Sequence, residues 1–299
     1  MFFNYYALEA LEAVVKDKSF SKAAQALHIT QSAVSQRIRE LERLVEQPLI
    51  VRSPEIRPTR AGQEFLAHFK KVSMLEGELK NSWLAEHPSG NPQTIAIALN
   101  TESLSTWFID AVSPVVSNGR IVLELLIDDQ EQTIKMLQNG RVWGCVTSIA
   151  KPPYGCTSTH LGKMVYRCVA TPAFKKRYFA GGVSAGSLLA APAAIYGEAD
   201  YMHDEYLKKY FKKYAQGRPV VHHIPSPEGL ISFAVKGMAF ALLPECSVRE
   251  CLKNDKLVDL MPERPLRLPL FWQTQELQTK LTRELSERII KHSKAVMET

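Results

Sequence analysis

Polar side chains at helical spacing gather early in the chain, in the stretch TQSAVSQRIR. Residues four positions apart share one face of a helix, which pairs Gln31 with Ser35 and Ser32 with Gln36. Gln fits the edge of adenine, Ser adapts to a base edge or a phosphate, and Arg39 beyond them fits guanine or a phosphate. This face is rich in hydrogen-bonding groups and poor in charge, which favours direct reading of DNA bases.

Three helical segments must position this face. The first has apolar residues at helical spacing, and the third has a buried stripe opposite its polar face. We expect Ser21 and Thr30 to cap the second and third helices, because a hydroxyl there accepts from a free backbone N–H. Residues 21–40 therefore predict a helix-turn-helix whose last helix enters the major groove. The apolar positions are Leu8, Leu11, Val14 and Val15, then Val34, Ile38, Leu41 and Val45.

A basic segment follows the predicted helices. Residues 48–62, PLIVRSPEIRPTRAG, read as two extended arms around a turn at Ser53–Pro54. A basic hairpin beside a recognition helix is typical of a wing that touches phosphates or the minor groove. Spacing alone also fits an ordinary helix pair with a solvated polar face, and the arginines favour DNA. The predicted DNA-binding residues are Ser21, Thr30, Gln31, Ser32, Ser35, Gln36, Arg39, Arg52, Arg57 and Thr59.

Composition and charge narrow the class of protein. A chain of 299 residues has room for two or three domains. The five cysteines are scattered without Cys-x-x-Cys, so we expect a reducing cytoplasm, no structural metal and no cofactor. No apolar run is long enough to span a bilayer, and the N-terminus lacks the basic start of a signal peptide. The net charge is +6, but residues 1–60 hold nine Lys/Arg against seven Asp/Glu, so pattern rather than bulk charge indicates DNA binding.

Residues 4 to about 62 resemble the winged helix-turn-helix of LysR-type transcriptional regulators. The resemblance rests on FSKAAQALHITQSAVSQRIRELE and on R-x-PT-x-AG at residues 57–62, with Glu55 a departure inside the wing. Within that family, EQPLIVR, RPTRAGQ and ALNTESLSTWF resemble the lysine- and arginine-responsive regulators of basic amino-acid export. The resemblance implies a linker helix that pairs two subunits and a sensor domain like periplasmic binding proteins.

The expected domains follow from this pattern. Residues 1–62 form the DNA-binding domain, 63–86 a linker and dimerisation helix, 87–93 a hinge rich in Pro and Gly, and 94–299 the effector-binding domain. The linker's apolar residues fall at roughly heptad spacing, which fits pairing with another helix or packing on its own domain. They are Phe65, Phe69, Val72, Leu75 and Leu79.

Strands and helices alternate in the second half of the chain. Runs such as TIAIAL (94–99), IVLELLID (121–128) and VWGCVTSI (142–149) predict strands, with helical segments between them. We therefore expect α/β architecture with parallel strands and two subdomains, about 94–163 with 268–299, and about 164–267. The predicted fold class is a mainly helical winged helix-turn-helix with a linker helix, then a periplasmic-binding-protein-like α/β effector domain.

Folds of this kind bind ligands in a cleft at the carboxyl ends of strands. The helix starts in NTES and SPEG offer free N–H groups to a carboxylate. Acids after strand ends fit an ammonium or guanidinium, although each also fits an ordinary N-cap or solvated turn. The predicted effector-binding residues are Asn100, Thr101, Ser103, Asp128, Asp129, Ser148, Glu198, Ser226 and Glu228.

Enzyme-like motifs are weak. GVSAG (182–186) matches a nucleophile motif, but a helical segment precedes Ser184 where a strand is needed. His222 and His223 are adjacent on a strand and point to opposite faces, which argues against chelation by both. We therefore predict a non-enzymatic regulator with three partners: double-stranded DNA, a small effector and a second copy, as dimer or tetramer. The resemblance implies lysine or arginine as the effector, and the alternative effector is another small polar or anionic metabolite. The alternative class of protein is a solute-binding or enzymatic α/β protein that does not bind DNA.

Overall fold

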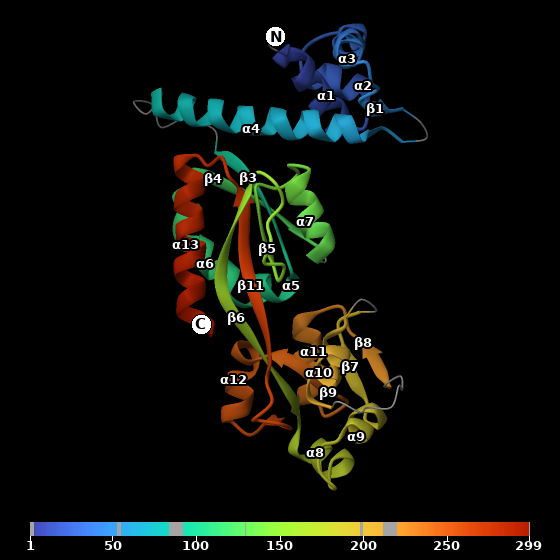
Figure 1. Ribbon diagram of the computed structural model, residues 1–299, viewed down its shortest axis with the longest axis vertical. Helices are drawn as coiled ribbons and strands as arrows, with labels where there is room; N and C mark the ends of the chain where they lie inside the picture. The colour runs from blue at the N-terminus through green and yellow to red at the C-terminus, as the bar shows by residue number, and fades with distance from the viewer. Residues whose placement is uncertain are drawn as a thin grey trace.

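The computed structural model describes residues 3–52, 55–83, 92–128, 130–197, 200–211 and 220–298. A small helical domain lies at one end, the long helix α4 crosses beneath it, and two lobes of mixed α/β structure follow (Figure 1). This is the multidomain fold class that the sequence predicts. No helix within these ranges is long and apolar enough to cross a membrane.

The N-terminal domain is built from α1 (Tyr5–Asp17), α2 (Phe20–Ala26) and α3 (Gln31–Val45), with a short hairpin of β1 (Ile50–Val51) and β2 (Arg57–Pro58). Their apolar faces meet in one core that excludes water. The fully buried residues of this core include Leu8, Leu11, Val14, Val34, Ile38 and Leu49.

Helix starts in this domain follow the hydroxyl-capping rule, with one correction. The Thr30 hydroxyl accepts from the Ala33 backbone N–H at 3.2 Å, as predicted. The prediction that Ser21 caps α2 is wrong, because Ser19 caps it and accepts from the Lys22 N–H. Both serines can accept, but only Ser19 has the extended backbone that a cap needs, and Ser21 lies exposed inside the helix.

The linker helix α4 spans Arg60–Trp83, so it starts three residues earlier than expected. Thr59 causes this start, because its hydroxyl accepts from the Gly62 N–H at 3.0 Å. The expected helix end and most of the hinge, residues 84–91, lie outside the described residues. Phe65 and Phe69 pack on the N-terminal core, whereas Leu75 and Leu79 are 37% and 60% exposed. The first half of the apolar stripe therefore packs on the N-terminal domain, and the second half lies on the surface.

A single mixed sheet of nine strands runs through both lobes. The order is β4-β3-β5-β11-β6-β9-β7-β8, with β10 paired to β6. The pairs among β3, β4 and β5 and among β7, β8 and β9 are parallel, as expected. The strands β6 and β11 are antiparallel to each other and to their neighbours β5, β9 and β10, and they pass from one lobe into the other (Figure 1). The bounds are β3 Gln93–Leu99, β4 Ile121–Ile127, β5 Gly144–Thr147, β6 Cys156–Ala170, β7 Ala193–Ile195, β8 Val221–His223, β9 Phe240–Pro244, β10 Val258–Asp259 and β11 Leu266–Gln275.

Helices cover both lobes of this sheet. In the lobe next to α4, α13 packs beside α6, and the buried indole of Trp272 donates to the Ser286 hydroxyl of α13 at 2.9 Å. The bounds are α5 Thr101–Ser103, the π-helical segment Leu104–Phe108, α6 Ile109–Val116, α7 Gln130–Gln138, α8 Pro172–Tyr178, α9 Ala185–Ala190, α10 Met202–Tyr210, α11 Pro227–Val235, α12 Glu245–Lys253 and α13 Lys280–Val296.

Candidate functional site

The polar face of α3 lies where a DNA groove can reach it. Gln31, Ser32 and Gln36 are exposed, and Ser35 is half-buried. The opposite side of the helix is fully buried against α1 and α2 through residues such as Val34. Burial of that side fixes which way the helix faces.

Hydrogen bonds within α3 orient two of these side chains. The Gln36 amide nitrogen donates to Glu40 Oε1 at 3.1 Å, so its amide oxygen remains to accept from a base. Arg39 Nε donates to the Ser35 backbone oxygen at 3.2 Å. The predicted reading face is therefore partly preordered before DNA arrives.

Ion pairs hold the wing against the helices. Arg52 lies 3.6 Å from the Glu42 carboxylate and stacks over the Phe20 ring. The second Glu42 oxygen accepts from the Leu49 N–H at 2.9 Å, so one carboxylate positions both the start of the wing and its arginine.

An ion pair also holds the second arm of the wing, residues 55–59, against the helices. Lys18 pairs with Glu55, which lowers the pKa of the Glu55 carboxyl below its ordinary value. Arg57 is exposed, whereas the Thr59 hydroxyl is already used within the domain, donating to Pro48 O at 2.7 Å. Ser53–Pro54, the predicted turn, lies outside the described residues.

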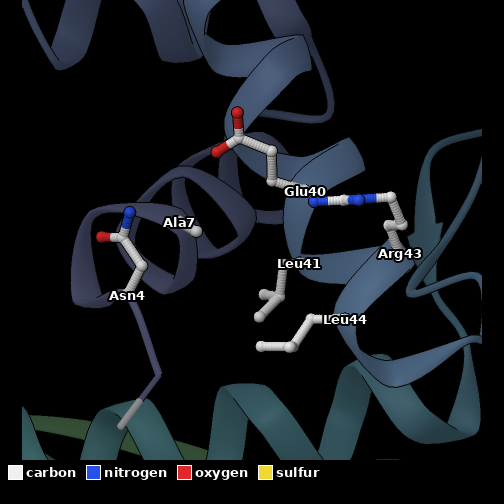
Figure 2. A pocket seen from close by; sticks show the side chains of 6 residues that line it. All are labelled: Asn4, Ala7, Glu40, Leu41, Arg43 and Leu44. Atoms are coloured by element: carbon white, nitrogen blue, oxygen red, sulfur yellow. The ribbon is translucent and has the colours of Figure 1, made fainter. Parts of the chain in front are cut away.

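A groove between α1 and α3 is a separate feature of this domain (Figure 2). Two leucines, one acid and one base contribute to its walls, and none of the predicted DNA-binding or effector-binding residues does. The lining residues are Asn4, Ala7, Glu40, Leu41, Arg43 and Leu44.

The start of α5 faces the other lobe of the effector domain. Asn100 caps it by accepting from the Ser103 N–H at 2.9 Å. The Thr101 hydroxyl donates to the Tyr196 hydroxyl, which follows β7, at 3.4 Å. Ser103 is fully buried, and its hydroxyl has no partner among the described residues. Three predicted residues thus gather where the lobes meet.

Two acids, Glu102 and Asp200, lie close to the Thr101–Tyr196 contact. Burial raises the pKa of the Glu102 carboxyl, and the nearby charge of Asp200 raises it further. Asp200 is held in place because it accepts from the Tyr196 and Met202 N–H groups at 2.9 and 3.0 Å. Both carboxylates also raise the pKa of the buried Tyr166 hydroxyl on β6, after the larger effect of its burial. Glu102, Tyr166, Tyr196 and Asp200 therefore belong to one region between the lobes.

The sequence prediction named neither Glu102 nor Tyr166 as a site residue. Glu102 stands second in a helix, where an acid is ordinarily solvated, and Tyr166 lies inside a strand. Asp200 follows a strand by several residues, which was the available signal. Their proximity arises only when the two lobes are assembled.

Other predicted effector residues lie elsewhere or outside the described ranges. Asp128 is exposed after β4, and Ser148 is half-buried after β5. Ser226 caps α11 and donates to Glu228 at 2.9 Å, so these bonds stay within one helical turn. Asp129 and Glu198 lie outside the described residues.

Enzyme-like motifs have structural explanations. Ser184 is the exposed N-cap of α9 and exchanges hydrogen bonds with Ser187. The His222 ring packs 5.2 Å from Phe233, and His222 and His223 are both exposed on β8. Within the described ranges, no group of three or more His, Cys, Asp and Glu residues is placed to hold a metal ion.

Known proteins share both halves of this architecture. A model of bacterial regulatory helix-turn-helix proteins of the lysR family matches residues 6–63, and a model of the LysR substrate binding domain matches residues 94–294. The chain belongs to the LysR family. It is a LysR-type DNA-binding transcriptional regulator. Members of this family bind DNA operators and form oligomers.

Relatives of this LysR chain share nearly its full length. The HTH-type transcriptional regulator ArgP of Photobacterium profundum is 37% identical over 98% of each chain. The crystal structure of ArgP from Mycobacterium tuberculosis has a TM-score of 0.87 and 32% identity over 98% of each chain. Full-length LysG from Corynebacterium glutamicum with bound effector Arg has a TM-score of 0.83 and 30% identity, over 99% of this chain and 100% of that one.

Proposed function

We propose that this LysR-type regulator senses a basic amino acid, arginine or lysine, between the two lobes of its effector domain. One observation carries the proposal: Thr101 of one lobe bonds to Tyr196 of the other, so Glu102, next to Thr101, and Asp200, which binds the Tyr196 N–H, lie in one partly buried region between the lobes. Two like charges out of bulk water are unfavourable unless a proton or a cation joins them. A guanidinium or ammonium group supplies that cation.

The rest of an amino acid fits the same place. Its carboxylate matches the backbone N–H groups of Thr101 and Glu102 at the start of α5, since the Ser103 N–H already donates to Asn100 and the Thr101 hydroxyl to Tyr196. Glu102 and Asp200 replace Asp128 and Glu228 as the acceptors for cations, because the latter two are exposed. The relatives named ArgP, and LysG with its bound Arg, support this choice.

The DNA site is proposed on α3 and the wing. We assign base reading to the exposed face with Gln31, Ser32 and Gln36, and phosphate contact to Arg57. Arg52 contributes partly through its pairing with Glu42, which positions the wing. We also place the protein in the cytoplasm, because a regulator must reach its operator.

Calorimetry on the full chain tests the effector. Lysine, arginine, glutamine and citrate are titrated separately, since they share size but differ in charge. We expect binding of arginine or lysine with glutamine far weaker. Tight binding of citrate without arginine or lysine would show that the effector is an anion and that only the assignment to the LysR family stands.

A further inference from the structure

One of the two strands that join the lobes, β6, is irregular where it pairs with β11 at Gly162 and Leu270. Gly162 of β6 pairs with Leu270 of β11, and the pairing register shifts between Leu270 and Phe271. Gly162 also has φ of +132°, a conformation that other residues rarely adopt. Leu161 is the extra residue of a bulge in β6, because Phe271 pairs with His160 directly after Leu270 pairs with Gly162. A bulge bends its strand and interrupts the ladder, so β6 has its bend at this rung.

The segment after α13 lies directly on this rung. The Lys163 N–H donates to the Glu298 backbone oxygen at 2.7 Å. A Cβ atom at Gly162 would lie 2.7 Å from Met297 Cβ and 3.0 Å from that same Glu298 oxygen. The absence of a side chain at Gly162 is therefore what allows Met297 and Glu298 to pack against the strand.

Charge adds to this contact. The Glu298 carboxylate pairs with Arg267 of β11, which lowers the pKa of the Glu298 carboxyl. Lys163 and Arg167 of β6 lower it further. Arg167 is in turn bonded to Glu245 at 2.7 Å and Asp259 at 3.3 Å, in the lobe remote from α4.

α13 belongs to the lobe next to α4, where it packs on α6 (Figure 1). Arg267 of β11 and Arg167 of β6 lie past the Gly162–Leu270 pair, on the part of these strands that pairs with β9 and β10 of the other lobe. A displacement of one lobe relative to the other about Gly162 must stretch or break the contacts of Glu298. The segment consequently resists bending of β6 and β11 at this rung.

We propose that Glu298 is a positioning residue for effector binding, which braces β6 and β11 in the lobe arrangement that brings Thr101 to Tyr196. The part concerning the effector rests on the proposed function. Loosening the brace lowers the population of this arrangement, so a ligand that needs it binds more weakly in proportion.

Two variants loosen the brace by different means. Glu298→Gln removes the ion pair with Arg267, and Gly162→Ala displaces Met297 and Glu298 by steric conflict without a change of charge. Glu284→Gln is the matched control, because Glu284 of α13 makes a similarly exposed ion pair with Arg120 at 3.2 Å, away from the bend.

Hydrogen–deuterium exchange of the full-length protein without ligand is the first measurement. We expect faster exchange at residues 162–166 and 266–270 in both brace variants, and wild-type exchange in Glu284→Gln. Arginine titration is the second, with binding weakened by roughly two- to fivefold in Glu298→Gln. A merely structural contact would change the melting temperature without this change in affinity.

The outcomes separate the two proposals. If exchange at the bend is the same in Glu298→Gln as in Glu284→Gln, the brace does not exist, whatever arginine does. If exchange rises but arginine affinity is unaltered, Glu298 holds the strands without positioning the switch. If the wild type binds neither arginine nor lysine, the effector assignment fails while the exchange result still decides on the brace.

Discussion

Replacing Glu102 by glutamine tests the acid pair between the lobes. The amide has nearly the shape of the carboxylate but no charge, so the repulsion with Asp200 disappears. A cationic ligand loses one charge-assisted hydrogen bond, which corresponds to about 1–3 kcal/mol. Asp200 remains in place through its two backbone contacts. We therefore expect arginine affinity to fall by about tenfold or more without complete loss of binding.

The same carboxyl makes binding depend on pH. The pKa of Glu102 is raised in the folded protein without ligand, and an arriving cation favours its ionised form. Binding must then release a proton wherever the pH lies between the lowered pKa of the complex and the raised pKa of the free protein. Arginine affinity should rise with pH through that window and level off above it, and Glu102→Gln should flatten the rise.

The free energy of unfolding depends on pH in the opposite direction from arginine affinity. Because the folded protein holds the Glu102 proton more tightly than the unfolded chain does, the free energy of unfolding falls as pH rises from the ordinary value of 4.5 to the raised one. Glu102→Gln removes this fall, so its unfolding should depend less on pH in that range.

Calorimetry at several pH values and in two buffers of different ionisation enthalpy measures affinity and proton release together. Glu124→Gln is the control, because Glu124 is an exposed acid on β4 of the same lobe. Equal arginine affinity in the wild type and Glu102→Gln, with no proton released, would refute the role given to the acid pair.

Three further predictions concern DNA binding and folding. Gln31→Ala should lose about 1–3 kcal/mol on the specific operator and less on random DNA in gel-shift titrations; equal losses would exclude direct base reading. Arg57→Ala should reduce the slope of log affinity against log salt by about one, and an unchanged slope would show that Arg57 does not contact phosphates. Arg52→Ala should reduce the slope and also lower the melting temperature, because the contact with Glu42 is lost. Gly62→Ala should lower the melting temperature, because the new Cβ would lie 2.1 Å from the Leu49 backbone oxygen. Gly77→Ala on the same helix is the control, because a Cβ there meets no atom within 4 Å and should not destabilise the protein. Similar melting temperatures for the two variants would contradict the close approach at Gly62.

Local chemistry explains what could be predicted of the N-terminal domain. The period of apolar residues in α3 and the hydroxyl of Thr30 act within one or two helical turns, so they are visible in the chain. The choice between Ser19 and Ser21 as cap of α2 was missed, because it depends on the backbone conformation set by the turn from α1. The division of the α4 stripe also depends on what its first half meets, namely the core of its own domain.

In the effector domain, the strands could be predicted from the sequence, but the pairing of β6 with β11 could not. Runs of apolar residues marked its strands, because burial on both faces of a sheet demands them. Strand pairing between β6 and β11 was not visible, since it joins segments far apart in the chain.

The sequence by itself therefore determined the family, the helix-turn-helix and the alternation of strands and helices, because each follows from short-range patterns of residue type. Only the tertiary structure decided that Glu102 and Asp200 share one region between the lobes and that Glu298 lies on the bend at Gly162. Electrostatic effects and steric contacts act over a few ångströms in space, and distance along the chain does not report them.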